Sequence, residues 1–249
     1  MIYQDDEQIF VAQIKEYLIQ AENQKKVILT KFLTLREQAI VKDIFQSSYV
    51  DVYYYGGYDD AERKRCLIMD PSIPYHESFF DIVCFKINYN KRFLTLRHQN
   101  VLGTLMSLKL DRSLFGDIIL DGDDVYFFTT KEIVPIIRQE FKVINRVPIQ
   151  VQVWEEPIEY KLEREERSII VPSLRIDTLI SHVFHLSRND AAQSIAAGYV
   201  YRNFQIATEK SMLCEVGDII SVRRHGRFTV GDIVRQTKKN KIVLNVTIP

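Results

Sequence analysis

The amino-acid sequence predicts an α+β fold made of three parts. Stretches with apolar residues at every third or fourth position, typical of helices, alternate along the 249 residues with short runs typical of strands. A charged stretch with six glutamates, at 155–171, separates an acidic body from a basic end. We therefore predict an N-terminal α/β segment at 1–74, a middle domain at 75–154, a charged linker at 155–171, partly helical, and a C-terminal module at 172–249.

The composition, with 46% hydrophobic and 27% charged residues, is typical of a globular protein. No stretch approaches the ~18 apolar residues of a membrane span. The acidic stretch Met1–Glu7 lacks the apolar run of a signal peptide. Cys66, Cys84 and Cys214 are far apart and form no Cys-x-x-Cys pair, which favours reduced thiols over a disulfide framework or a zinc site. We expect a cytoplasmic protein without a metal or other cofactor.

The N-terminal segment begins with helices. Apolar residues at helical spacing predict helices over 9–18 and 34–45. A strand at Tyr49–Tyr55 and a turn at Gly56-Gly57 follow. Asp59 and Glu62 are spaced like the two acceptors of a capping box, so a helix is expected to begin at Asp59. A short apolar strand is predicted at Cys66–Met69.

The middle domain has the order strand, helix, strand, strand, helix, strand, at 79–88, 99–108, 116–120, 125–129, 131–141 and 148–154. Asp121-Gly122 between the second and third strands is a hairpin signal. This is the ferredoxin-like order, shared by RRM-like RNA-recognition domains. An RNA-recognition domain exposes aromatic residues in a basic setting on its third strand. Tyr126, Phe127 and Phe128 occupy that strand, but Asp123 and Asp124 beside them would repel phosphate, which favours a packed sheet.

Charge is divided unevenly along the chain. The formal net charge is zero, yet from Pro172 onward eleven Lys/Arg stand against six Asp/Glu, a net charge of +5. The rest of the chain therefore carries −5. This division indicates a module that binds a polyanion, attached to an acidic body, although +5 is also compatible with an ordinary solvated surface.

The C-terminal module begins with two predicted helices. Ile176, Leu179, Ile180 and Val183 form an apolar stripe on a helix over 175–185. Ser187 is expected to cap a second helix and Gly198 to end it in the left-handed conformation. Short strands follow at 199–202, 206–207 and 219–223, with turns at Asn203-Phe204 and at 216–218.

Several short motifs, in the correct order, resemble the ribosomal-protein S4-type RNA-binding domain. They are Arg175-Ile176-Asp177, Leu186-Ser187-Arg188, Ala197-Gly198-Tyr199-Val200, Arg202-Asn203 and Val216-Gly217-Asp218-Ile219-Ile220. The resemblance implies that the helix pair and the adjoining loop bind structured ribosomal or transfer RNA, and that Asn203 shapes a turn. Tyr199 replaces a common basic residue, and Phe204 stands where glycine usually follows the asparagine. The RNA-binding residues implied are Arg175, Ser187, Arg188, Asn189, Tyr199, Arg202, Asn203, Lys210, Arg223 and Arg224.

Motifs elsewhere resemble a narrower group, the YlmH family of bacterial S4-type proteins. They are Gly56-Gly57-Tyr58 with 61–65, Val101-Leu102-Gly103-Thr104-Leu105-Met106, and Phe115-Gly116-Asp117-Ile118. The resemblance implies a cytoplasmic protein that binds rRNA and tRNA at the large ribosomal subunit, with a role in ribosome quality control. It also implies possible cell-division partners. Arg63, Lys64 and Arg65, at an expected helix start, are a possible second phosphate-binding patch; a solvated helix face is the equal alternative.

Catalysis is not indicated. Acidic clusters at 59–62 and 121–124 are explained by a helix start and a hairpin turn. His182 and His185 lack a third metal ligand. Since pseudouridine synthases and RNA methyltransferases carry S4-type domains as accessories, an RNA-modifying enzyme is one alternative, although no Gly-rich nucleotide loop is present. A cell-division scaffold is the other. We predict a non-enzymatic RNA-binding protein.

Overall fold

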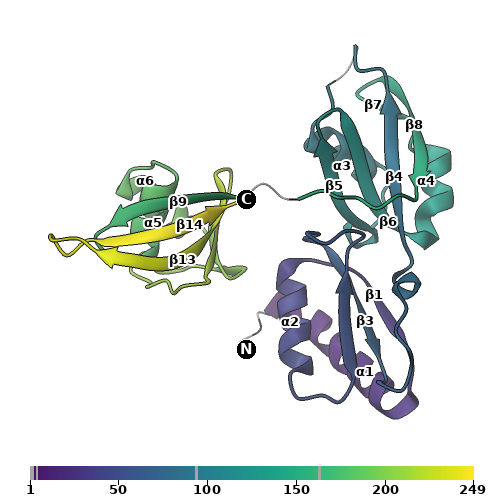
Figure 1. Ribbon diagram of the computed structural model, residues 1–249, viewed down its shortest axis with the longest axis horizontal. Coiled ribbons are helices and arrows are strands. Elements are labelled where there is room, and N and C mark those ends of the chain that lie inside the picture. The colour runs from purple at the N-terminus through teal and green to yellow at the C-terminus, as the bar shows by residue number, and fades with distance from the viewer. Residues whose placement is uncertain (1–2, 4, 93–94, 162–163) are drawn as a thin grey trace. The chain divides into compact units, whose positions relative to one another are not determined.

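The computed structural model describes residues 3, 5–92, 95–161 and 164–249 (Figure 1). The chain divides into two compact units, Met1–Lys161 and Leu162–Pro249. Residues 1–2 and 4 of the acidic N-terminal stretch, and 162–163 of the predicted linker, lie outside the described residues. No helix within the described ranges is long and apolar enough to cross a membrane.

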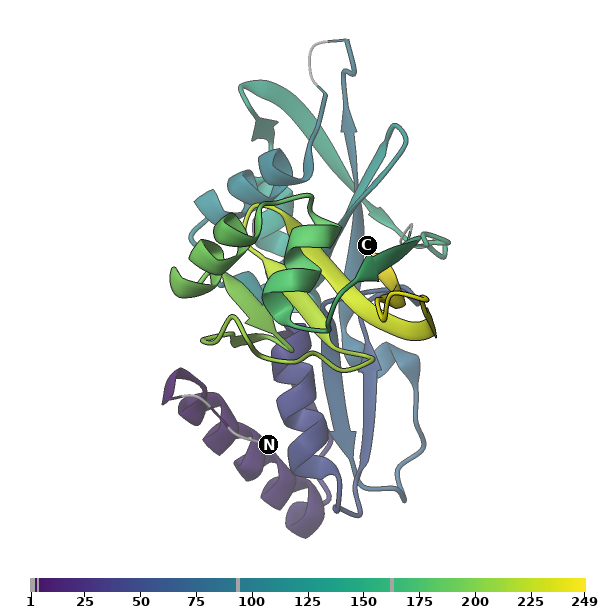
Figure 2. The same ribbon diagram turned by 90° about the vertical axis from the view of Figure 1, so that its left-hand side faces the viewer.

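The first part of unit 1 has two helices against a three-stranded sheet. The elements are α1 (Gln8–Gln24), β1 (Ile28–Leu33), α2 (Leu35–Phe45), β2 (Asp51–Tyr55) and β3 (Lys64–Met69), with strand order β1-β3-β2. Apolar residues of both helices pack with Cys66 and Ile68 of β3, so α1 and α2 cover the same face of the sheet (Figure 2). The predicted helix at 34–45 is confirmed, with Thr34 and Glu37 forming a capping box.

The helix predicted to begin at Asp59 is wrong. Asp117, which is far along the chain, accepts hydrogen bonds from the backbone N–H of Glu62 (2.6 Å) and Arg63 (3.2 Å). It also accepts one from the Tyr58 hydroxyl (3.0 Å). In a capping box, the Glu62 N–H would donate to the Asp59 side chain. In the structure it donates to Asp117 instead. Turns and bends occupy 57–63, and β3 follows directly.

The second part of unit 1 contains the predicted order of six elements. They are β4 (Ile82–Tyr89), α3 (His98–Ser107), β5 (Phe115–Asp121), β6 (Asp124–Thr130), α4 (Val134–Glu140) and β8 (Val147–Trp154). A short strand, β7 (Val143–Ile144), is added, and the antiparallel sheet has the order β5-β6-β4-β8-β7. Single 3-10 turns lie at Asp5–Glu7, Glu77–Phe80, Arg112–Leu114 and Lys131–Ile133.

Both faces of this sheet are packed near its centre. Phe85 and Phe127 are buried in a core with apolar residues of α3 and α4. On the opposite face, Phe128 is buried against Tyr58, with ring centroids 5.4 Å apart. Tyr126 is only 7% exposed. The aromatic triplet of β6 is therefore core, as the neighbouring acids indicated, and two YlmH-like motifs meet where Tyr58 bonds Asp117.

Unit 2 is a six-stranded sheet with two helices on one face (Figure 1). Its elements are β9 (Glu165–Val171), α5 (Ile176–Val183), α6 (Arg188–Ala196), β10 (Val200–Arg202), β11 (Gln205–Ile206), β12 (Ile219–Val222), β13 (Gly226–Gln236) and β14 (Ile242–Ile248). The strand order is β11-β10-β12-β13-β14-β9. Leu179 and Ile180 of α5 and Ile195 of α6 pack on Phe228 and Leu244 of the sheet.

The predicted linker at 155–171 extends too far. Residues 165–171 are the edge strand β9, which pairs with β14 along its whole length, from Val171↔Ile242 to Glu165↔Ile248. Ile169 and Val171 are buried in the core of unit 2. This strand is difficult to recognise in the sequence because it begins with glutamates. An edge strand can carry such residues, since only one of its faces packs on the core. We expected part of 155–171 to be helical, but the described residues of this stretch form no helix.

Candidate nucleic-acid interface

The helix pair of unit 2 is fixed by local signals. The apolar stripe of α5 is buried, and Ser181 Oγ donates to the carbonyl of Leu186 (2.7 Å) in the connection to α6. Ser187 caps α6 by accepting from the Asp190 N–H (3.1 Å). Gly198, at φ 71°, ends the helix in the left-handed conformation. The predicted caps are therefore confirmed, and they leave Arg188 and Asn189 exposed in the first turn of α6.

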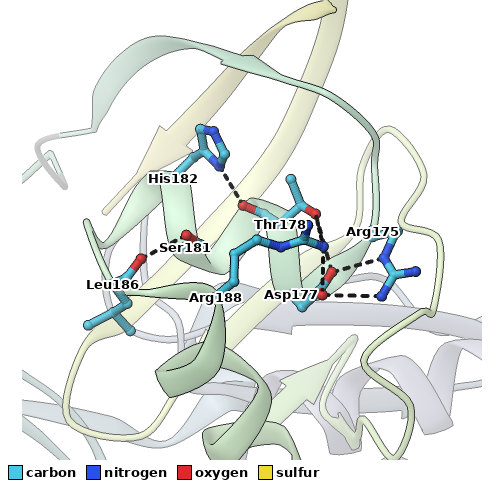
Figure 3. Close-up of polar contacts among 7 residues, drawn as sticks. All are labelled: Arg175, Asp177, Thr178, Ser181, His182, Leu186 and Arg188. Atoms are coloured by element: carbon cyan, nitrogen blue, oxygen red, sulfur yellow. Dashed lines mark hydrogen bonds and ion pairs between the residues drawn. The ribbon is translucent and has the colours of Figure 1, made fainter.

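Asp177 gathers two of the predicted RNA-binding residues (Figure 3). Arg175 Nε and Nη2 donate to its two carboxylate oxygens at 3.1 and 3.2 Å. Arg188 Nη2 donates to Oδ2 at 3.0 Å and to the Thr178 hydroxyl at 3.3 Å. The Asp177 side chain is 5% exposed, whereas the Arg188 side chain is 57% exposed. The carboxylate thus holds two arginines, from two helices, with their remaining donors near the surface.

The charge state of Asp177 follows from these contacts. Burial alone would raise its pKa, but hydrogen bonds from Arg175 and then Arg188 outweigh burial and hold the pKa below its usual value. Asp177 is therefore ionised at neutral pH. A guanidinium has five N–H donors, so an arginine that donates two to a carboxylate keeps others for phosphate oxygens.

A second buried carboxylate, Asp218, organises the turn after β10. Arg202 Nε donates to Oδ2 and the Asn203 side-chain amide to Oδ1, each at 2.6 Å. Asn203 also accepts from the Ile219 N–H (2.9 Å) and has φ 49°. Asn203 and Phe204 both have positive φ, as a two-residue hairpin loop requires. Asn203 therefore shapes the turn, as expected, and Phe204 tolerates the same conformation.

Tyr199 and Arg223 form a third group. The Arg223 guanidinium lies 5.3 Å from the centroid of the Tyr199 ring, and the Arg223 N–H donates to the Tyr199 carbonyl (2.9 Å). Tyr199 is 44% exposed. An exposed ring beside a guanidinium is a surface on which a base can stack. Lys210 and Arg224 are also exposed, but the structure assigns them to none of the three groups.

The second phosphate patch is not assembled at 63–65. Arg65 is buried and donates to the carbonyls of Thr30 (2.7 Å) and Phe80 (2.7 Å). Arg63 donates to the carbonyls of Phe115 (3.1 Å) and Phe32 (3.1 Å). Both guanidinium groups satisfy backbone acceptors inside unit 1, and the expected helix start is absent. Burial also lowers the pKa of Arg65 to about 10.

Two features of unit 2 were not predicted from the sequence. The pairing of Asp177 and Asp218 with arginines is one, because no local pattern indicates it. The basic hairpin of β13 and β14 is the other, although the density of lysines at 238–241 is a visible signal.

His182 Nδ1 lies 2.8 Å from the Thr178 carbonyl. Within the described residues, no group of three or more His, Cys, Asp or Glu could hold a metal ion.

The sequence comparisons agree with this geometry. Residues 174–220 match the family model of the S4 domain, so the protein is of the S4-domain class. Residues 6–73 match the model "YlmH, N-terminal", and residues 74–158 match "Putative RNA-binding domain in YlmH". The chain belongs to the YlmH family.

Two relatives place this family membership in context. The chain is 28% identical over 245 residues to the "Ribosome-associated protein quality control protein P2" of Bacillus subtilis (strain 168), covering 96% of this chain and 94% of the relative. A solved structure, "Cell division protein ylmH from Streptococcus pneumoniae", is similar with a TM-score of 0.54 and 22% identity. It covers 62% of this chain and 94% of the solved one, and the similarity concerns the fold alone.

Proposed function

We propose that this protein binds structured rRNA and tRNA at the large ribosomal subunit, in the cytoplasm, and acts without catalysis in ribosome-associated quality control. The arrangement of arginines on Asp177 and Asp218 carries the proposal. Asp177 fixes two arginines and Asp218 fixes one, and each guanidinium keeps further N–H donors for phosphate oxygens. The name of the Bacillus subtilis relative supports the ribosome as the setting.

The absence of catalysis is part of the proposal. Two of the matching family models, the S4 domain and the putative RNA-binding domain in YlmH, are RNA-binding, and the half-buried Asp117 is occupied by structural hydrogen bonds. An RNA-modifying enzyme predicts a modified nucleotide that disappears from RNA when the gene is deleted. A cell-division scaffold predicts partners that remain bound after RNase treatment. A non-enzymatic RNA-binding protein predicts neither outcome.

Co-sedimentation of the full chain with large ribosomal subunits tests the proposal. Arg188→Glu replaces an exposed donor with a like charge beside Asp177, so it should repel both Asp177 and RNA phosphate. We expect the amount of the variant in the pellet to fall at least about tenfold at physiological salt, since about 1.4 kcal/mol corresponds to that factor.

Lys15→Glu is the matched control, because Lys15 is exposed on α1 and the variant makes the same change in net charge. It should pellet like the wild type, and circular dichroism should show that both variants are folded. Undiminished pelleting of Arg188→Glu, or of a chain that lacks 162–249, would contradict the proposed function.

A further inference from the structure

The net charge of unit 2 is concentrated outside the S4-type motif. From Leu162, where unit 2 begins, to Arg224, eight Lys/Arg stand against eight Asp/Glu, a net charge of zero. From His225 to Pro249, five Lys/Arg stand against the single acid Asp232, a net charge of +4. The residues that match the S4 model end at 220, whereas the net positive charge lies on β13, β14 and the turn between them.

Four of the five cations of this hairpin, all except Arg227, also differ from the arginines of the S4-type motif in their partners. Arg175, Arg188 and Arg202 each pair with a buried carboxylate. By contrast, the described part of the chain provides no ion-pair or hydrogen-bond partner for four cationic side chains, Arg235, Lys238, Lys239 and Lys241, all of which are exposed. A cation without a carboxylate partner can neutralise a phosphate directly. Each phosphate that is neutralised releases counterions that were condensed on the nucleic acid.

The turn that presents these lysines is well defined. The Thr237 N–H donates to the Lys241 carbonyl (2.8 Å), and the Lys241 N–H donates to the Thr237 hydroxyl (3.0 Å). Asn240 has φ 56°, the left-handed residue that closes a three-residue hairpin loop. Lys238 and Lys239 are therefore held at the corners of a fixed turn, which reduces the entropy lost when they bind.

The hairpin also stands clear of the core near its tip. Among the described residues, β12 pairs with β13 only from Gly226 to Thr229, and no described strand pairs with that edge of β13 beyond Thr229. Ile233 and Val234 are 46% and 54% exposed, at an irregularity in the pairing of β13 with β14. Figure 1 shows the tip extending past α5, α6 and β9. The acids of β9, Glu165 and Glu166, pair near the opposite end of β14, away from the tip.

We propose that the β13–β14 hairpin is a second RNA-binding element, which binds phosphates of a structured RNA through Arg235, Lys238, Lys239 and Lys241. The inference rests on the proposed function, because the same RNA would also contact the S4 domain. Val171 pairs with Ile242, at the base of the tip, and four residues of chain then lead to Arg175. That chain spans at most about 14 Å, so Arg175 of the Asp177 cluster lies within that distance of Val171, the partner of Ile242.

Salt-dependent binding of the full chain to a short RNA stem-loop, followed by fluorescence anisotropy, tests this inference. In the triple variant K238Q/K239Q/K241Q, three phosphate contacts are lost. The slope of the logarithm of affinity against the logarithm of salt should then become shallower by about 2.1 to 2.7. Between 50 and 200 mM salt, the wild type should therefore lose roughly 20- to 40-fold more affinity than the variant does.

The control K15Q/K26Q/K42Q removes three exposed lysines from unit 1 and makes the same change in net charge. It should keep the wild-type slope. An unchanged slope for the hairpin variant, or an equal change in the control, would overturn the inference. If Arg188→Glu abolishes binding while the hairpin variant matches the wild type, the proposed function stands and only the hairpin is excluded. If the wild type itself does not bind RNA, the proposed function fails.

Discussion

Two buried carboxylates organise the basic surface of unit 2. Asp177 orients Arg175 and Arg188, which come from the N-cap of α5 and the start of α6. Asp218 orients Arg202 and, through Asn203, fixes the turn after β10. These pairs neutralise part of the positive charge and in return hold planar donor groups in place. The carboxylates therefore orient the arginines but lower the net positive charge of this surface.

Asp177→Asn should destabilise unit 2 at neutral pH by about 1–3 kcal/mol, because charge-assisted hydrogen bonds are lost. The pKa of Asp177 lies below its unfolded value in the folded chain. Its contribution to stability is therefore present above the unfolded pKa of 3.8 and is lost as the pH falls through the folded pKa. The difference in unfolding free energy between wild type and variant should be constant above about pH 5 and shrink below it.

Urea unfolding at several pH values, followed by circular dichroism, measures this difference. Trp154, the single tryptophan, lies in unit 1, so its fluorescence separates the transition of that unit. A difference that stays constant down to pH values well below 3.8 would mean that the Asp177 pairs do not stabilise unit 2.

Residue-level features with local causes were predictable from the sequence. The Ser187 cap, the left-handed Gly198 and the Asn203-Phe204 turn each depend on neighbouring residues, and the structure contains all three. The Asp177–Arg188 pair was not predictable in the same way, because its partners are on different helices. It depends on how the two helices pack, which helical spacing alone does not give.

At the scale of elements, β9 defines where unit 2 begins. It supplies Ile169 and Val171 to the core and covers the edge of β14. The sequence-based boundary at 172 places this strand in a linker because its first four residues, 165–168, are charged or polar. The helix expected at Asp59 is wrong for a related reason: Asp117 binds the N–H groups from a distance, so tertiary contact overrides the local pattern.

A fragment of residues 162–249 should be markedly more stable than one of residues 172–249. Burial of an Ile or Val side chain contributes about 1.5–3 kcal/mol, so loss of Ile169 and Val171 removes roughly 3–6 kcal/mol before strand hydrogen bonds are counted. Small domains have only about 5–15 kcal/mol in total. Urea titrations of the two fragments, followed by circular dichroism, should show a cooperative transition for the longer one. Equal midpoints would mean that β9 is dispensable.

At the scale of the whole molecule, the chain joins an acidic body to a basic RNA-binding unit. The charge division and the order of the S4-type motifs were visible in the sequence, as was the element order of the middle domain. The internal distribution of the +5 was not predicted, because the strands β13 and β14 were not assigned and their lysines were counted with the S4-type motif. The structure separates a surface of paired arginines from a hairpin whose four exposed cations have no partner among the described residues.

Cross-linking of the protein to RNA in living cells, followed by sequencing of the attached RNA and identification of the cross-linked peptides, tests the central claim most directly. We expect enrichment of large-subunit rRNA and tRNA, with cross-linked peptides from α5, α6 and the β13–β14 hairpin. A chain that lacks 162–249 is the control. RNA recovery no greater than from this truncated chain, or cross-links confined to unit 1, would contradict the claim that unit 2 binds ribosomal RNA.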